Sequence, residues 1–451
     1  MLNLWGKPLT GTCEGTSRRE FMKVGALGLT GFGLPSLLRQ RAAAAAEGRS
    51  VKDTSVVWVW LGGGATHIET FDPKMEAPSE FRSVVGSVST SIPGVEIGGL
   101  FPKMAQRANE MAFVRSFAHG NSGHGGGTHF VMTGTDHPAA DGGGAGPIKP
   151  SFGSIAARVR GTNHPTTGVP TFVRLSGLYA DGPSWLGAGY GPFDVGGEAR
   201  NNMNLKTDMA RLGDRRSLLT QVDRLDRSID RKGLLDGVEQ FEDQAFRLIL
   251  SRAKEAFDLT REDPRLRDKY NGAGTNFGDQ LLLARRLCEA GCGFVTLNYA
   301  NSAQGWDMHG DPAQPATLSI GKQLEQACPP MDHAISVFLE DLAQRGLSQK
   351  ILLVVTGEFG RTPRVNGHNG RDHWGPLCTL ALAGGGLKMG QVVGESSPKA
   401  EVPKTTPIQP KHLMATIFHV LGIDQHAQYV DQSGRPQYLL PDGSAPIREL
   451  I

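Results

Sequence analysis

The chain has 451 residues, of which 39% are hydrophobic and 20% charged, and its formal net charge is +2. These values are typical of one large soluble α/β domain or two smaller ones, and they give no indication of an anionic membrane as a partner. Glycine accounts for 60 residues, well above its usual share of about 7%. This frequency indicates many tight turns and close backbone approaches rather than a plain helical bundle.

Residues 1–46 have the pattern of an export signal. The pair Arg18 and Arg19, within "SRREFMK", closely matches the motif that the twin-arginine export machinery recognises. The apolar stretch 24–38 is diluted by Gly and shorter than the ~20 residues of a membrane span, and the alanine run 42–46 suits cleavage. An amphipathic first helix is the alternative. We expect no stable membrane span, and export of the folded protein to the periplasm or the extracellular space.

The remaining chain, 47–451, is almost neutral. The export signal contains six Lys and Arg and two Asp and Glu, so 41 basic and 43 acidic side chains remain, a net charge of −2. Nucleic acid is therefore not expected as a partner. Cys288 and Cys292 could share a helix face, but no CxxC motif or nearby His accompanies them. We expect these two cysteines to pack in the core rather than to bind zinc.

Six apolar runs have the length of β-strands. They are apolar throughout instead of alternating, which indicates strands buried on both faces, as in a parallel sheet. Helical patterns lie between them, at 277–291, 331–347 and 411–422. The alternation predicts an α/β fold, a three-layer αβα sandwich with a mostly parallel central sheet. The apolar runs are 55–61, 112–115, 171–175, 294–299, 351–355 and 378–383.

Residues 205–270 differ from the rest because they are highly charged and have a helical pattern. Four apolar residues step by four, three and four, which is a heptad-like seam. We interpret this segment as a helical insertion within one domain; a dimerising coiled coil is the alternative, but two glycines interrupt the seam early. The seam residues are Leu218, Val222, Leu225 and Ile229.

Loops that follow four of the predicted strands are rich in residues of the metal-binding type. Since ligand sites in parallel sheets lie beyond the carboxyl ends of the strands, we expect these loops to meet at one edge. For each loop His the alternative is a structural or solvated group. The residues are His67, Glu69, Asp72 and Lys74; His119, His124 and His129; Asp307, His309 and Asp311; and Glu358, Arg361, His368, Arg371, Asp372 and His373.

Two of these loops carry the strongest signals. Asp307 and His309 are two residues apart, so in an extended segment their side chains project on the same side. Asp372 and His373 are adjacent, and a loop can present one as a ligand and the other as its support. Mixed oxygen and nitrogen ligands suit zinc, manganese or iron better than calcium.

Two arginines in the last loop suggest an anion site. Arg361 and Arg371 each follow a glycine, and a guanidinium can hold phosphate or sulfate with two parallel hydrogen bonds. For both residues, a salt bridge to a carboxylate within the same loop is the alternative.

Several sequence blocks resemble the DUF1501 family of exported bacterial proteins. They include "GGGATHIETFDPK" at 62–74, "RSFAHGNSGHGGGTHFVMTG" at 115–134, "GWDMHG" at 305–310 and "VTGEFGRTP" at 355–363. By resemblance this family is placed in the alkaline phosphatase/sulfatase-like superfamily, whose members hydrolyse phosphate or sulfate esters with one or two metal ions. The resemblance implies an alkaline-phosphatase-like domain over 47–451, a divalent metal ion and no organic cofactor.

The resemblance also implies which residues bind the metal. Glu358 stands where the superfamily has a metal-binding Asp in a T-x-D-H-G segment, but Phe359 replaces the His of that segment. Asp307 and His309 match an earlier Asp and His pair with tighter spacing, and His373 matches the final His ligand. Together with Asp372, which the loop pattern adds, the expected metal ligands are Asp307, His309, Glu358, Asp372 and His373.

The first-strand ligand and the nucleophile match less well. The glycines at 62–64 occupy the place of an Asp, so Glu69 or Asp72 would have to substitute. Counting back from the Thr-Gly that ends the following helix puts His124 in place of a Ser or Thr nucleophile. His124 is thus a candidate catalytic residue, as a nucleophile or as a metal ligand, and Arg361 is a second candidate.

Two functions follow from these patterns. The first is an exported metal-dependent hydrolase of sulfate or phosphate esters, including esters on polysaccharide. The second is a non-catalytic binding or scaffold protein that keeps the fold and holds an anionic glycan. Fold alone does not distinguish them. A formylglycine of the sulfatase type is disfavoured because no C-x-P-x-R motif occurs.

Overall fold

The computed structural model describes residues 52–137, 148–196, 253–272, 274–300, 302, 304–430 and 435–451. The predicted export signal and residues 205–252 of the predicted insertion lie outside these ranges. The chain divides into two compact units, of which the larger comprises residues 52–426 and 440–451. The described part of the smaller unit contains one antiparallel pair, β13 (Gln428–Val430) and β14 (Pro436–Tyr438). None of the helices within the described ranges combines the length and apolarity that crossing a membrane requires.

The larger unit is built on an eight-stranded sheet in the order β12-β4-β11-β8-β1-β7-β5-β6. All neighbours in this sheet are parallel except β11, which runs antiparallel to both β8 and β4. The predicted α/β class with a mostly parallel sheet is therefore confirmed. The strands are β1 (Ser55–Trp60), β4 (Met111–Val114), β5 (Phe172–Arg174), β6 (Phe193–Asp194), β7 (Phe294–Asn298), β8 (Ile351–Thr356), β11 (Leu380–Gly384) and β12 (Gln391–Val393).

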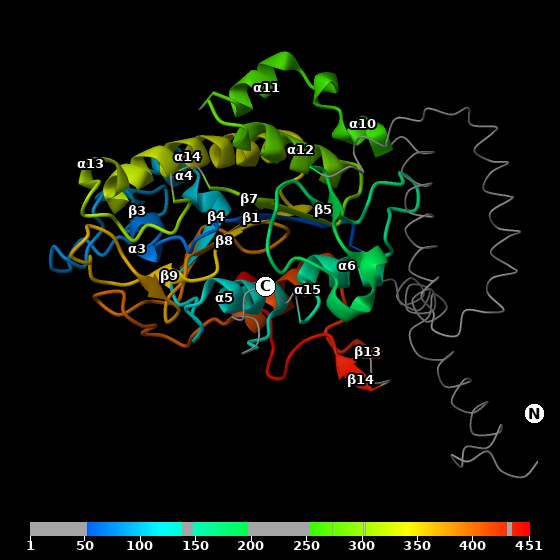
Figure 1. Ribbon diagram of the computed structural model, residues 1–451. Helices are drawn as coiled ribbons and strands as arrows, with labels where there is room; N and C mark the ends of the chain where they lie inside the picture. The colour runs from blue at the N-terminus through cyan, green and yellow to red at the C-terminus, as the bar shows by residue number, and fades with distance from the viewer. Residues whose placement is uncertain are drawn as a thin grey trace, which may run out of the picture. The chain divides into compact units, whose positions relative to one another are not determined.

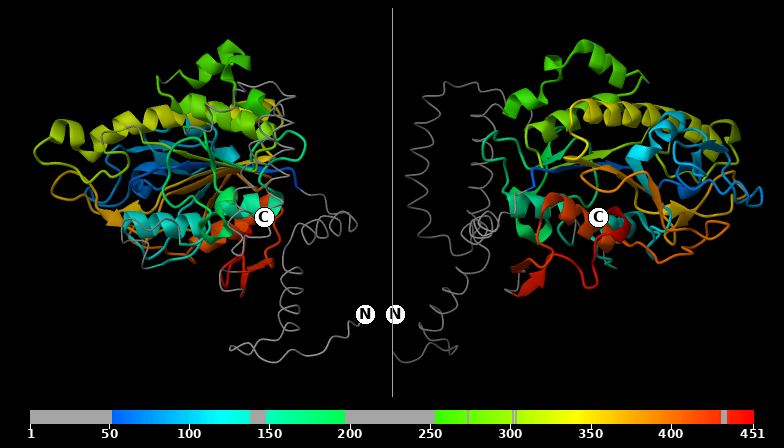
Figure 2. Two further views of the ribbon diagram at one scale, coloured as in Figure 1. Left: turned by 45° about the vertical axis from the view of Figure 1, so that its right-hand side comes forward. Right: turned by 180° about the vertical axis from the view of Figure 1, so that it is seen from behind.

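Helices cover both faces of this sheet, as the alternation of patterns predicts. Figure 1 shows α4, α12 and α14 on one side of the strands and α5, α6 and α15 on the other, and both views in Figure 2 keep this separation. The helices are α3 (His67–Thr70), α4 (Pro102–Gln106), α5 (His124–Thr133), α6 (Phe152–Arg160), α10 (Ala253–Phe257), α11 (Pro264–Tyr270), α12 (Phe277–Glu289), α13 (Pro315–Leu318), α14 (Ile320–Gln344) and α15 (Pro410–Leu421). Short strands β2 (Ser87–Ser89), β3 (Glu96–Gly98), β9 (Gly360–Arg361) and β10 (His373–Trp374) lie in the connections.

Helix α14 begins eleven residues before the predicted start at 331. Pro329 and Pro330 lie inside it, and proline normally ends a helix because it lacks the N–H donor and its ring clashes with the preceding turn. Residues ahead of the prolines, including Ile320 and Leu324, are nevertheless buried. Burial of that apolar face sustains the first turns of the helix, an effect that local sequence rules do not contain.

The two faces of β1 illustrate why the strands are apolar throughout. On one face Trp58 is fully buried, with its ring 5.5 Å from that of Phe152 in α6 and 6.2 Å from that of Phe294 in β7. On the other face Val57 belongs to the same core cluster as Leu281 of α12. A central strand that is covered by helices on both sides favours apolar side chains at nearly every position, and Ser55, the polar residue of β1, donates to the carbonyl of Cys292 over 2.6 Å.

The register of the sheet brings three strand exits level with one another. Trp60 at the end of β1 pairs with Asn298 of β7 and with Thr356 of β8, and the three strands are parallel. The loops that begin at Leu61, Tyr299 and Gly357 therefore leave the sheet side by side at its carboxyl edge. Helix α5, which follows β4, begins near the same edge.

Candidate metal centre

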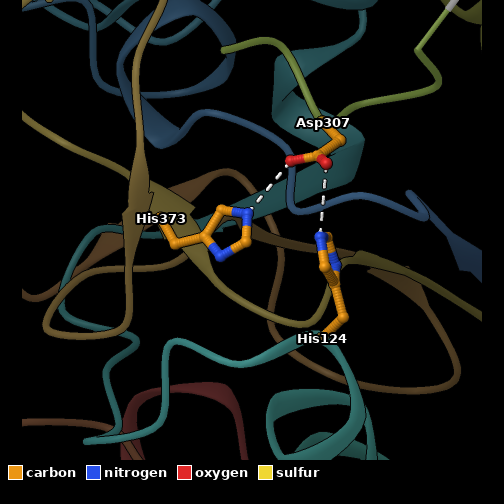
Figure 3. Close-up of side chains that lie close together, drawn as sticks. All are labelled: His124, Asp307 and His373. Atoms are coloured by element: carbon orange, nitrogen blue, oxygen red, sulfur yellow. Dashed lines mark hydrogen bonds and ion pairs between the residues drawn. The ribbon is translucent and has the colours of Figure 1, made fainter. Parts of the chain in front are cut away.

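Four side chains from three loops converge at this edge, and we call them the histidine cluster: His124, Asp307, His309 and His373. His124 is the first residue of α5, Asp307 and His309 follow β7, and His373 opens β10. The carboxylate of Asp307 is the centre of the cluster. Its oxygens lie 3.3 Å from Nε2 of His124, 2.9 Å from Nε2 of His309 and 3.0 Å from Nε2 of His373. Figure 3 shows His124 and His373 reaching this carboxylate from two sides.

Each imidazole of the histidine cluster is held by an oxygen at its other nitrogen. Nδ1–H of His124 donates to Glu358 over 2.8 Å, that of His309 to Asp372 over 2.9 Å, and that of His373 to the carbonyl of Ser122 over 2.9 Å. An oxygen acceptor at Nδ1 fixes the tautomer and leaves the lone pair at Nε2, as is usual for metal-binding histidines.

This orientation favours positive charge inside the histidine cluster. Nε2 of His309 and Nε2 of His373 are 3.0 Å apart, and both face the same oxygen of Asp307. Lone pairs of neutral imidazoles at such distances repel one another and the carboxylate, so a cation or protons between them would be favourable, in addition to Arg361, whose Nη1 lies 3.4 Å from Nε2 of His309. His124, Asp307 and His373 each offer one ligand atom, and these three atoms lie within 4.8 Å of one another.

The pKa values reflect the same electrostatics. Burial alone would raise the pKa of Asp307, but hydrogen bonds from His124, His373 and Arg361 lower it far below its usual range. Hydrogen bonds to Asp307 and then to Glu358 raise the pKa of His124 to about 9, against the smaller effect of burial. In the protonated form, His124 bridges two carboxylates.

Glu358 supports His124 and also leaves one oxygen unused. Its Oε1 accepts from Nδ1 of His124 and from the N–H of Gly63, over 2.8 Å in both cases. Its Oε2 is buried and has no hydrogen-bond partner within the described part of the chain. A buried carboxylate oxygen without a partner is costly, and a bound cation would satisfy it. The predicted role of Glu358 as a metal ligand stays a prediction.

Asp372 lies in a different position from the one expected. Its carboxylate is half exposed and accepts from Nδ1 of His309 and from the Asn366 amide, over 2.9 and 3.1 Å. The oxygen thus reaches the far side of the imidazole rather than the centre of the cluster. Asp372 thus orients His309, which is the supporting role that the adjacent pair Asp372 and His373 allows, and its predicted role as a direct ligand stays a prediction.

Arg361 holds Asp307 and is not free to grip an anion. Its side chain is fully buried, and Nη2 donates to Asp307 over 2.5 Å and to the carbonyl of Gly63. Nε donates to the carbonyl of Gly64 over 2.8 Å, and Nη1 to that of Arg371 over 3.1 Å. With these donors taken, the predicted catalytic and anion-binding roles of Arg361 do not fit, and its role is to fix the carboxylate.

Arg371 is also buried and occupied. Its guanidinium pairs with Glu69, and both side chains are completely inaccessible to solvent. The predicted anion-binding role is corrected for the same reason: the donors are used within the protein. The partner is a carboxylate 302 positions away in the sequence, not one in the same loop.

Phe359, which cannot bind a metal, forms an apolar wall beside the cluster. Its buried ring lies 4.3 Å from the ring of His373 and 5.1 Å from that of His124, measured between centroids. Gly64 makes room for it: the backbone there has φ +82°, and a Cβ would stand 2.3 Å from the Phe359 ring. Gly64, near the end of β1, thus serves packing.

The other loop histidines and acids named by the sequence lie outside the cluster. His67 and His119 are buried, His129 bonds to the carbonyl of Thr135, and His368 is exposed. Asp72 pairs with Lys74. The sequence could not predict that the carbonyl of Ser122 accepts a hydrogen bond from His373, because every residue has a main-chain carbonyl.

Burial of His67 predicts a loss of stability in acid. Burial lowers its pKa to about 4, despite a hydrogen bond from Nε2 to the carbonyl of Ala400, whereas an unfolded His titrates near about 6.5. Between these values the unfolded chain binds the additional proton, so this contribution to stability is complete above about pH 6.5 and is lost as the pH falls to about 4. The loss amounts to about 3 kcal/mol.

Urea unfolding at pH 7, 5 and 4 measures this effect. We expect His67→Gln to reduce the difference in unfolding free energy between pH 7 and 4, and His426→Gln, at an exposed position, to leave it unchanged. An unaltered pH dependence in His67→Gln would contradict the assignment.

No curated protein has a sequence significantly similar to this chain. Among solved structures, the PsFucS1 sulfatase from Pseudoalteromonas sp. is 13% identical, with 87% of this chain and 73% of that chain covered and a TM-score of 0.37. The phosphonate monoester hydrolase SpPMH from Silicibacter pomeroyi is 14% identical, with 88% and 78% covered and a TM-score of 0.36. The lipoteichoic acid synthase LtaP from Listeria monocytogenes is 10% identical, with 84% and 74% covered and a TM-score of 0.35.

The family assignment rests on the sequence match. Residues 53–451 match a family described as "Protein of unknown function (DUF1501)", which covers the whole described part of the chain except Lys52. Two of the sequence blocks that resemble this family, 115–134 and 305–310, contain residues of the histidine cluster. The chain belongs to the DUF1501 family.

Proposed function

We propose that this protein is a metal-dependent hydrolase of sulfate or phosphate esters, including esters on polysaccharide. The observation that supports it most is the convergence of three Nε2 atoms on the Asp307 carboxylate, each from an imidazole whose Nδ1 is held by oxygen. Two nitrogens and one carboxylate lie within 4.8 Å of one another, with Nε2 of His309 beside them, and this donor set suits zinc and also fits manganese or iron. A bound divalent ion polarises an ester and supplies a hydroxide at neutral pH.

The surroundings of the histidine cluster support a reactive site. Side chains of His124 and His309 are 46% and 38% exposed, so one side of the cluster is open to an ester. On the other side the buried ring of Phe359 keeps water away from His124 and His373. The buried guanidinium of Arg361 holds the carboxylate of Asp307. A fixed carboxylate and oriented imidazoles cost no reorganisation when a ligand arrives.

Metal analysis together with an ester assay tests the proposal. We expect one equivalent of a transition metal per chain, and hydrolysis of a chromogenic sulfate or phosphate ester that falls more than about 100-fold on chelation and returns on adding one equivalent of metal. Absence of stoichiometric metal, or hydrolysis that chelation leaves unchanged, would contradict it.

A non-catalytic binding protein is the second candidate. Two observations favour it: Phe359 offers no ligand, and both arginines expected to grip an anion are saturated within the protein. Metal bound at one equivalent without turnover of either ester would support this candidate, with an anionic glycan as the ligand to test.

Export to the periplasm or the extracellular space is also a proposal. It rests on the pair Arg18 and Arg19 and on the short apolar stretch that follows. We expect Arg18→Lys combined with Arg19→Lys to retain the precursor in the cytoplasm, because the export receptor recognises the arginine pair. Cell fractionation measures this, and normal export of the double variant by the same pathway would refute it.

A further inference from the structure

We infer that the buried ion pair between Glu69 and Arg371 positions the loops that carry the histidine cluster. The inference rests on the proposed metal site and assigns to these two residues a role as positioning residues, not catalytic ones. It replaces the anion-binding role that the sequence suggests for Arg371.

The guanidinium of Arg371 joins separate segments of the chain. Nε donates to both oxygens of Glu69 over 3.1 and 3.2 Å, and Nη2 to Oε1 over 2.8 Å, in a forked arrangement. Nη2 also donates to the carbonyl of Arg82 over 3.0 Å, and Nη1 to the carbonyls of Thr362 and Pro363. These contacts use every N–H of the side chain, so the guanidinium has one arrangement available.

The main chain of Arg371 connects this anchor to the cluster. Its N–H donates to the carbonyl of Met308, over 3.1 Å, and Met308 stands between Asp307 and His309. Its carbonyl accepts from Nη1 of Arg361, the residue that holds Asp307. The next two residues along the chain are Asp372, which orients His309, and His373. Arg371 therefore connects two of the three loops that supply the histidine cluster, the one with Asp307 and His309 and the one with His373.

Geometry separates this role from a purely stabilising one. A shift of Arg371 would displace His373 through the main chain and Asp307 and His309 through Met308 and Arg361. Partners that orient metal ligands typically account for about 10–100-fold in metal affinity. Arg285, another buried arginine, contributes to stability without this connection.

Arg285 provides the matched control. It is 1% exposed and pairs with Glu262, Glu289 and Asp341 over 2.9, 2.6 and 3.0 Å. None of these partners belongs to the histidine cluster or bonds to it within the described ranges. Arg285→Lys therefore disturbs a buried ion network of similar kind at another place in the fold.

The experiment compares Arg371→Lys and Glu69→Asp with Arg285→Lys in the full mature chain. Each change keeps the charge but breaks the forked geometry. We expect Arg371→Lys and Glu69→Asp to weaken Co²⁺ binding by about 10–100-fold and to change its visible absorption spectrum. In the metal-free protein labelled with ¹⁵N-histidine, we expect the ring resonances of His309 and His373 to move in these two variants only.

The outcomes are distinct. If Arg371→Lys or Glu69→Asp is folded and has wild-type Co²⁺ affinity and wild-type histidine ring resonances, the positioning role is refuted. Equal changes in Arg285→Lys would refute it as well, because the effect would then be general destabilisation. If the wild-type protein binds no Co²⁺, the proposed metal site fails, and the ring resonances of the metal-free variants still decide whether the ion pair positions the histidines.

Discussion

Asp307→Asn is expected to abolish stoichiometric metal binding and ester hydrolysis together. Asp307 is the only carboxylate that all three Nε2 atoms of the histidine cluster approach within the described residues. Removal of a partner that merely supports a ligand costs about 10–100-fold in affinity, so loss of this central ligand should cost more than about 100-fold. Metal content after gel filtration and the rate of ester hydrolysis are the measurements.

The same substitution should also destabilise the protein. The guanidinium of Arg361 is fully buried and loses its carboxylate partner, while its bonds to main-chain carbonyls remain. Breaking a fully buried pair typically costs about 3–5 kcal/mol. Since the Asp307 side chain is 34% exposed, water compensates part of this loss, and we expect about 1–3 kcal/mol in urea unfolding.

Asp311→Asn is the matched control for Asp307→Asn. Asp311 is in the same loop, and its oxygens bond only to Ala313 and Gln314 among the described contacts. This variant should retain metal binding, hydrolysis and stability. Metal binding by Asp307→Asn at the wild-type level would show that the cluster is not the metal site.

The sequence indicates the location of the site well because strand patterns are local. A continuous apolar run such as 351–355 predicts a buried strand, and polar residues that follow such runs must gather at one edge of a parallel sheet. All six predicted runs correspond to strands of the sheet. The direction of β11 was not predictable, because it depends on the path of the connection that contains β9 and β10.

The roles of individual residues could not be predicted in the same way. Glu69 and Arg371 are adjacent only in the folded chain, and no spacing rule relates positions 302 apart. A glycine before an arginine suggests a free guanidinium, but burial decides whether its donors are used internally, and Arg361 and Arg371 are both saturated. Asp372 and Asp307 are equivalent as residue types; only the direction of each carboxylate separates a support from a central ligand.

His124→Ala should separate function from stability. His124 is at the start of α5, preceded and followed by glycine, and its side chain is 46% exposed. Truncation removes one of three converging nitrogens, so we expect metal affinity and ester hydrolysis to fall more than about 100-fold. Glu358 keeps its bond from the N–H of Gly63, but Glu358 and Asp307 each lose their contact with the imidazole. A lost hydrogen bond typically costs about 1 kcal/mol, so the unfolding free energy should fall by only about 1–2 kcal/mol.

A control variant and two alternative outcomes of His124→Ala identify the role of His124. His368→Ala removes an exposed imidazole from the loop that carries His373 and should change neither metal content nor hydrolysis. If His124→Ala keeps its metal but loses turnover, His124 acts on the ester as nucleophile or proton donor rather than as a ligand. If the variant unfolds readily yet binds metal and hydrolyses ester at the wild-type level, His124 is a packing residue, and the cluster must function without it.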